Sequence, residues 1–473
     1  MNQESIRDSE LARQMETAFK ASYFIGKYYF SINTKKKRSE FGLLPGIEIP
    51  LEVQRKLREE NIIPLFHEYI HYIHEISTVV GSLYLNLDLV QKSIFSFYFS
   101  ADQKVATHNG IDKRDTSRSE VNAQSYHSKE VINGSSITNA KIIKVSSYKY
   151  VAMPFYLVGG ENTITDEIQL PVLTVEIFED GRYANEEINF GNFFIYEGLA
   201  YELDRELDKQ LRGLTDISDD NIYSEYTVLR LLANLIYPGI NKYIFLSYAS
   251  LSLSYMDPGY TFIQLLKKTK ASVEAGERLD DIIHRHKKET SFRLHGKKDE
   301  FISSQDEIVG LFENRMQLHK AFAAIAAASK NGYELKIKNP SFEVDLIMSG
   351  QYAKLPEILP ICDYMYQFDD IDEWNRDLFG TASYSDDVSE SLRVLIAFDH
   401  YQKSHVLKST IELEKEKKIK CPLFTCCTHP LRQSQVTVCA EKPWRMFEVS
   451  ADSEFPYCWY GQAVGEFKGH STI

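Results

Sequence analysis

The chain has 473 residues, of which 43% are hydrophobic and 26% charged, and its formal net charge is −13. This length predicts two or three lobes that fold without disulfide bonds, and the acidic balance argues against a nucleic-acid or acidic-membrane binder. The first twenty residues lack the apolar segment of a secretory signal, and the apolar run at 243–256 is too short to span a bilayer. We therefore expect a cytoplasmic protein that does not cross a membrane.

Residues 1–60 are expected to form an N-terminal segment that contains one strand and two helices. Residues 1–20 look helical and polar, and 23–32 are rich in the aromatic and β-branched residues that favour a strand. Residues 51–61 have the charged, amphipathic pattern of a helix.

The next stretch, PLFHEYIHYIHEISTVVG at 64–81, contains an HExxH pattern formed by His67, Glu68 and His71. Pro64 suits the first turn of a helix, which could continue to about residue 97. At 100° per residue, this helix places His67, Glu68, His71, His74 and Glu75 on one arc and surrounds them with apolar side chains. The pattern predicts a buried helix with a single polar stripe.

Buried imidazoles and carboxylates need a partner, and two histidines one helical turn apart are suited to bind a zinc ion. Glu68 follows the first histidine directly, so it would lie beside the metal as a general base for a water molecule. The small residues Thr78 and Gly81 continue the same face, and we expect them to leave room for a substrate above the helix.

Between the HExxH helix and the next helical pattern, the sequence predicts a β-rich insertion at about 101–190. Residues 101–139 are polar and should form a long loop or flap outside the core. Residues 140–158 and 168–178 have strand patterns, and Asp180-Gly181 predicts a hairpin turn leading back to Ile188. A strand of this insertion could hold an extended peptide by backbone hydrogen bonds.

Residues 191–214, GNFFIYEGLAYELDRELDKQLRGL, predict a second polar-striped helix with Asn192 as N-cap and Gly213 as its end. A catalytic zinc ion usually has three protein ligands, and Glu197 is the preferred third candidate because Gly198 and Ala200 permit close helix approach. Glu202 is the main alternative, followed by Glu75 and His74. For His74 we favour a hydrogen bond to a carboxylate such as Asp204 over direct ligation.

Taken together, the two motifs resemble those of the gluzincin branch of zinc metallopeptidases, in which a glutamate from a later helix completes the HExxH site. The resemblance covers the motifs rather than the chain. It implies zinc ligation by His67, His71 and Glu197 and catalysis by Glu68. The sequence departs from the thermolysin type at Tyr201, where that type has an acidic residue, and the next acid on this face is Asp204.

Beyond residue 216 the patterns predict a helical domain up to about 415, with helices at 223–235, 243–255, 260–268, 307–329 and 393–408. The basic segment 284–298 is interpreted as a solvated, flexible connection. His400, His405, Tyr196 and Tyr201 are candidates for a donor that stabilises an oxyanion.

The last segment, 416–473, is rich in cysteine, with Cys421, Cys426, Cys427, Cys439 and Cys458 near His429. The spacing lacks paired CxxC motifs, so buried free thiols are the favoured interpretation. If a structural zinc ion binds there, Cys421, Cys426, Cys439 and Cys458 are the first ligand set to test.

The sequence therefore predicts a mainly helical α+β protein with a zincin-like metal site on two helices, divided into segments 1–60, 61–215, 216–415 and 416–473. The expected function is a zinc-dependent peptidase that acts on a protein or peptide substrate, and an activating protein that gates it is a candidate partner. The alternative is a catalytically silent or partner-gated regulatory protein that keeps the same fold and uses its cleft to bind a partner.

Overall fold

The computed structural model describes residues 21–23, 29–33, 62–102, 124, 127–128, 130–134, 141–159, 162–179, 182–213, 224–355, 363–367, 372–376, 386–406, 420–424, 427 and 429–468. The helices expected at 1–20 and 51–61, and most of the loop expected at 101–139, lie outside these residues. Two residues of that loop, Val131 and Ile132, are buried in a small apolar cluster, so this part of it belongs to the core.

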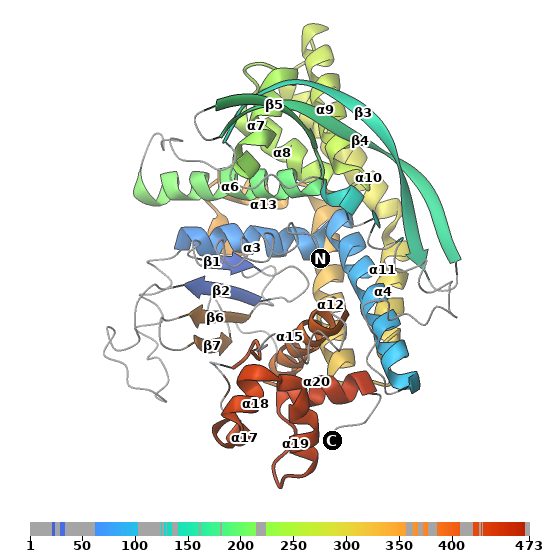
Figure 1. Cartoon of the computed structure of the whole chain (residues 1–473). Helices are drawn as coiled ribbons and strands as arrows, with labels where there is room; N and C mark the ends of the chain where they lie inside the picture. Colours follow the sequence, from blue (N-terminus) through green and yellow to red (C-terminus); the bar gives the residue numbers. More distant parts are fainter. Residues whose placement is uncertain are drawn as a thin grey trace.

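Within the described residues the protein is mainly helical and has two β-sheets, which confirms the α+β class (Figure 1). The α-helices are α3 (Ile62–Ser77), α4 (Val79–Asp102), α6 (Asn192–Arg212), α7 (Ser224–Ile236), α8 (Lys242–Ser252), α9 (Pro258–Glu274), α10 (Leu279–Gly296), α11 (Lys298–Gly310), α12 (Met316–Lys338), α13 (Phe342–Met348), α15 (Asp386–Val406), α17 (Pro430–Ser434), α18 (Val436–Glu441), α19 (Met446–Ala451) and α20 (Trp459–Lys468). No helix among them is both long and apolar enough to cross a lipid bilayer.

Helix α3 is the centre of the fold. Every residue from Leu65 to Ser77 is buried except Glu68, which is partly exposed. The helix packs against α6 and α12, and Figure 1 shows α6 running alongside it. Gly332 of α12 permits this packing, because a Cβ atom there would lie 2.9 Å from the carbonyl oxygen of Ile76. The apolar surroundings predicted for the HExxH helix are thus supplied by two neighbouring helices.

Helix α3 ends at Ser77, so the prediction of one helix continuing to about residue 97 is wrong. The hydroxyls of Ser77 and Thr78 donate hydrogen bonds of 2.6 Å to the carbonyls of Ile73 and His74, a type of bond that bends helices. The chain then continues in a different direction as α4 (Figure 1). Gly81 is required at the bend, because a Cβ atom there would approach the carbonyl oxygen of Glu75 to 2.2 Å.

The predicted insertion contains a three-stranded antiparallel sheet of β3 (Lys141–Gly159), β4 (Asn162–Glu179) and β5 (Arg182–Asn189). Glu179 pairs with Arg182, as the predicted hairpin requires, although the two turn residues lie outside the described part of the chain. Strand β3 contacts α7 and β4 contacts α9, so the sheet arches over these two helices (Figure 1).

A second sheet joins distant parts of the chain in the order β1 (Ala21–Tyr23), β2 (Tyr29–Asn33), β6 (Asp363–Gln367) and β7 (Asp372–Arg376). The single strand expected at 23–32 is therefore two antiparallel strands, β1 and β2. Strand β2 pairs in parallel with β6. Parallel pairing between segments more than 300 residues apart has no local sequence signal, and β6 and β7 were not predicted.

The predicted helices beyond residue 216 are present, with two differences. The helix expected at 307–329 is divided between α11 and α12. The segment 284–298, expected to be a flexible connection, lies almost entirely in helix α10. One face of α10 belongs to the core, with Ile282, Ile283 and Leu294 buried. His286 is buried on it too, and its Nδ1 lies 3.1 Å from the Tyr248 hydroxyl.

Candidate metal centre

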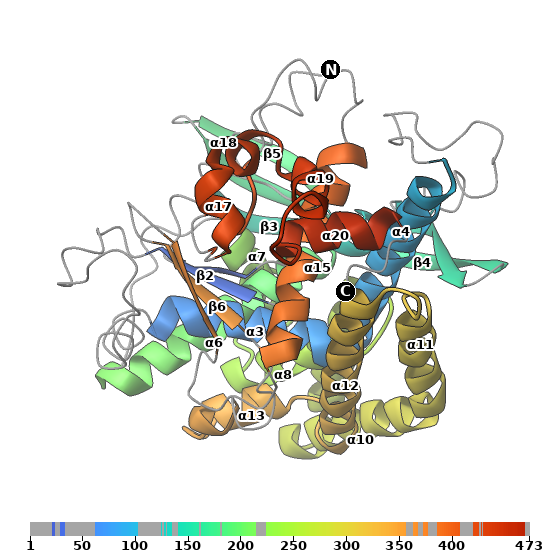
Figure 2. The same ribbon diagram turned by 90° about the horizontal axis from the view of Figure 1, so that it is seen from below.

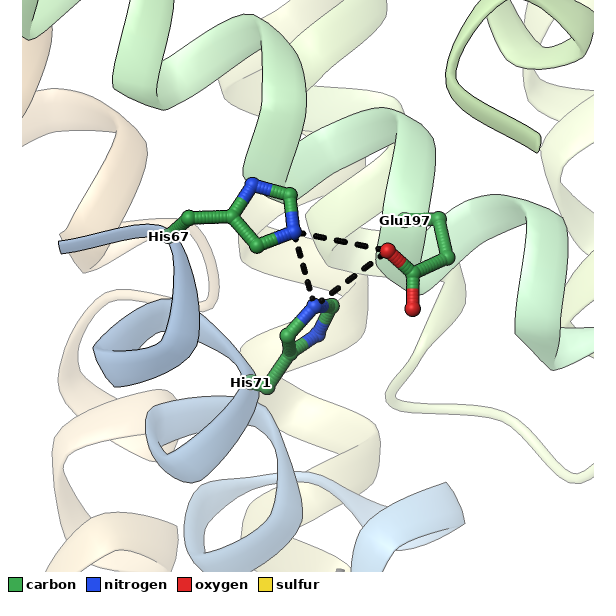
Figure 3. Close-up of side chains that lie close together, drawn as sticks. All are labelled: His67, His71 and Glu197. Atoms are coloured by element: carbon green, nitrogen blue, oxygen red, sulfur yellow. Dashed lines mark hydrogen bonds and ion pairs between the residues drawn. The ribbon is translucent and has the colours of Figure 1, made fainter. Parts of the chain in front are cut away.

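Helices α3 and α6 bring three potential metal ligands together (Figure 3). Nε2 of His67 and Nε2 of His71 lie 3.1 Å apart, and each is 3.4 Å from Oε2 of Glu197. Both histidines are buried, while the Glu197 side chain is 22% exposed. The three donor atoms therefore face one point between the two helices.

Local sequence accounts for each position. His67 and His71 are one helical turn apart, so their rings extend from the same face of α3. Glu197 lies in the second turn of α6, which begins after Gly191 and ends at Gly213 with the left-handed φ of 65°. Gly191, not Asn192, is thus the N-cap. Gly198 allows α7 to approach, since a Cβ atom there would lie 2.6 Å from Cβ of Leu229.

Asp204 orients the first histidine from one side. His67 Nδ1 lies 2.8 Å from Oδ2 of Asp204, so Nδ1–H donates to the carboxylate and Nε2 is directed toward His71 and Glu197. Metal-binding histidines commonly have such a partner, which fixes the tautomer and makes the free nitrogen a stronger ligand. Asp204, the next acidic residue on the helix face of Tyr201, is therefore in contact with a candidate ligand.

The carboxylates of Glu197 and Asp204 favour a positive charge between α3 and α6. Burial alone would lower the pKa of His67, but the hydrogen bonds to Asp204 and Glu197 outweigh it and raise this pKa well above its usual value. Burial would raise the pKa of Glu197, yet His71 and His67 hold it far below its usual range. A cation placed among these groups would be attracted by both carboxylates.

The donor set fits a zinc ion. Two imidazole nitrogens and one carboxylate oxygen are the three protein ligands of one common class of catalytic zinc sites, and the donor atoms here all lie within 4.8 Å of one another. Glu68, adjacent to His67, is partly exposed, and its charge acts on His67 and on Tyr226. The geometry can thus hold a divalent ion beside a carboxylate that solvent reaches.

The alternative third ligands have other partners. Glu202 is buried against Arg230 Nη1 at 3.1 Å and Lys242 Nζ at 3.2 Å, which directs it away from the histidine pair. Glu75 is buried too. In the part of the chain that the structure describes, neither residue belongs to a three-donor group.

The prediction that His74 lies against a carboxylate is confirmed, but the carboxylate is Glu343 and not Asp204. His74 Nε2 lies 3.3 Å from Oε1 of Glu343 on α13, and Glu343 also accepts a 2.7 Å bond from Lys336. All three side chains are fully buried, and burial lowers the pKa of His74 to about 4 despite the carboxylate. Asp204 instead contacts His67, with Nδ1 and Oδ2 2.8 Å apart.

The substrate space expected above Thr78 and Gly81 is also absent at those two residues, because both are buried. Thr78 Oγ1 caps the end of α3 and lies 3.4 Å from the Tyr196 hydroxyl. These small residues serve the bend between α3 and α4 instead.

Of the four candidate oxyanion donors, two tyrosines lie near the histidines. The ring of Tyr196 is centred 6.3 Å from that of His71, and the ring of Tyr201 stacks on Tyr226 at 5.0 Å. His400 Nδ1 lies 3.0 Å from the Tyr460 hydroxyl on α20. The side chain of His405, in α15, is outside the described structure.

Tyr226 of α7 is a residue that the sequence did not single out. Its ring meets the His67 ring edge-on at 5.6 Å. Burial, followed by the negative charges of Glu197 and Glu225, raises its pKa, so the hydroxyl keeps its proton at neutral pH. It occupies one position in an ordinary helical pattern, and only the packing of α7 on α6 places it at this site.

Comparison of the chain with protein-family models, with curated proteins and with solved structures produced no match.

Proposed function

We propose that the protein is a zinc-dependent peptidase whose metal is held by His67, His71 and Glu197, as in gluzincins. The observation that carries the proposal is the convergence of these three donor atoms from α3 and α6, together with the 2.8 Å contact of Asp204 behind His67. Structural zinc sites in proteins are closed by four protein ligands, whereas three protein ligands leave a position for water or substrate.

A bound zinc ion would lower the pKa of a water molecule and polarise the carbonyl of the scissile bond. The chain's own groups carry the proton. Glu68, beside His67 and partly exposed, takes the proton of the attacking water and returns it to the leaving amine. Asp204 holds the His67 ring in one tautomer through this sequence of events.

Tyr226 is our choice for the donor to the developing oxyanion. Its hydroxyl remains protonated, and its ring lies against His67 on the α7 side of the site. A donor that the protein holds in place beside developing charge contributes more than a freely solvated one. Tyr226→Phe should therefore lower kcat with little change in KM, whereas Tyr237→Phe, a tyrosine that follows α7, should change neither.

The test of the proposal combines metal analysis with turnover. Zinc content of the purified protein is measured by elemental analysis. Cleavage of a mixture of peptides derived from unfolded proteins is followed by mass spectrometry. We expect Glu68→Gln to keep zinc and lose at least about 100-fold in turnover. His71→Ala should lose both zinc and turnover, and Asp208→Asn, on the same helix as Glu197, should lose neither.

Normal turnover in Glu68→Gln would rule out the general-base role, and a wild-type protein whose zinc content does not respond to His71→Ala would rule out the site. Zinc at this site without cleavage by the wild type would instead favour the regulatory or partner-gated protein, because gating changes access and not ligand chemistry.

A further inference from the structure

Four cysteines of the C-terminal segment surround one small cavity. Cys421, Cys427, Cys439 and Cys458 all line it, together with Arg432. They come from separate pieces of chain: two precede α17, one lies in α18 and one directly precedes α20. Backbone contact also ties the pieces together, since the amide of Cys421 donates a 2.9 Å bond to the carbonyl of Cys439. Figure 2 shows α17 to α20 gathered beside α15, on the side of the molecule away from α6.

We propose that Cys421, Cys427, Cys439 and Cys458 bind a second zinc ion with a structural role. Four soft thiolate donors in a closed set are typical of structural zinc, and this set differs from the first one expected from the sequence by Cys427 in place of Cys426. The four cysteines form no disulfide.

The backbone around the sulfur atoms supports metal-bound thiolates. The sulfur of Cys421 accepts the amide hydrogen of Leu423, and that of Cys427 accepts the amide hydrogen of His429. Cys458 accepts from Tyr460 and, at 3.4 Å, from Gly461. Amide donors two and three residues after a cysteine stabilise a negative sulfur, and three of the four cysteines have them.

The size of the cavity selects the ligand. Its volume of about 20 Å³ is enough for one ion or one water molecule and too small for an organic molecule. The wall is almost entirely apolar apart from the sulfur atoms, His429 and Arg432. A water molecule would find few strong hydrogen-bond partners there, whereas sulfur atoms are preferred ligands of a thiophilic cation.

Arg432 lines the same cavity as the four cysteines. A zinc ion with four thiolates keeps a net negative charge, which this cationic side chain can offset.

The short elements of this segment explain why a metal would be useful. The helices α17, α18 and α19 have five or six residues each, too few to be stable alone. Among the described residues only the histidine group has three donors within 4.8 Å of one another, so zinc binding would draw the four sulfur atoms closer together.

The experiment measures zinc per chain in the full-length protein purified without chelator. We expect two ions in the wild type, one in His71→Ala, one in Cys458→Ser and none in the double variant. Cys362→Ser, the matched cysteine control, should retain both. Cys426→Ser should also retain both, whereas loss of zinc in Cys426→Ser with retention in Cys427→Ser would overturn the ligand set.

A spectroscopic measurement covers the case in which Cys458→Ser fails to fold. The His71→Ala protein, which keeps all cysteines, is loaded with Co²⁺ in place of zinc. Intense sulfur-to-metal charge-transfer bands and the strong visible bands of tetrahedral cobalt are expected. Their absence would overturn the proposal. Zinc that depends on Cys458 and not on His71 would support it while refuting the proposed peptidase site, so the two failures are distinguishable.

Discussion

His67 and Asp204 are joined through Nδ1 and Oδ2 at 2.8 Å, although 137 residues separate them in the chain. The contact crosses from α3 to α6 on the side of the ring opposite Glu197. It therefore couples the orientation of the first candidate ligand to the packing of the two helices.

Replacing Asp204 by Asn should weaken zinc binding by about 10- to 100-fold, because the amide holds the imidazole less firmly and no longer strengthens its free nitrogen. Asp208→Asn is the matched control, since Asp208 lies one turn later on α6 and pairs with Arg212 at 2.6 Å. Zinc affinities are measured by competition with a chromophoric chelator. Equal affinities for the two variants would contradict the orienting role.

Zinc affinity should rise with pH, because the His67 ring must lose a proton before it can bind the metal. Its pKa in the metal-free protein is raised by Asp204 and Glu197 against the effect of burial, so the ring is still protonated above pH 6.5. A zinc ion must displace that proton, so affinity should increase about tenfold per pH unit until the pKa of His67 is passed. Calorimetry in two buffers of different ionisation enthalpy checks the proton release, and an affinity independent of pH between 6 and 8 would refute it.

Glu202→Gln should retain zinc but reduce the free energy of unfolding by about 1–3 kcal/mol, because Arg230 and Lys242 each lose one buried charged partner. Glu197→Gln should show the reverse pattern, with weakened zinc binding. Urea denaturation and elemental analysis of both variants separate the two roles. If Glu202→Gln is the variant that loses zinc, the assignment of the third ligand is wrong.

Gly198→Ala should lower the free energy of unfolding by about 1–3 kcal/mol, because the new methyl group collides with Leu229 and separates α6 from α7. Gly296 is the control, since a Cβ atom there meets nothing within 4 Å and alanine in α10 should change stability by no more than about 1 kcal/mol. Urea denaturation measures both. Equal effects would show that the α6–α7 contact is not tight.

The helical character of α3 and α6, and the placing of His67 and His71 on one face, could be predicted from the sequence, because both depend on a periodicity of 3.6 residues that is visible locally. The sequence also predicted the β4–β5 hairpin, since the turn and the strand patterns lie within one short stretch. The mainly helical α+β class follows from the same kind of local signal.

Which polar groups are in contact could not be predicted from the sequence. Asp204 pairs with His67, Glu343 with His74 and Glu202 with Arg230, and each pairing depends on how the helices cross. Periodicity alone cannot tell which of several polar residues on one helix face will contact a given residue of the neighbouring helix. Strand β2 pairs in parallel with β6, and four cysteines gather around one cavity. In both cases the sequence pattern of one segment does not predict which other segment it will contact. The physical reason is that side-chain contacts across a core depend on the relative positions of whole elements, which local periodicity does not encode.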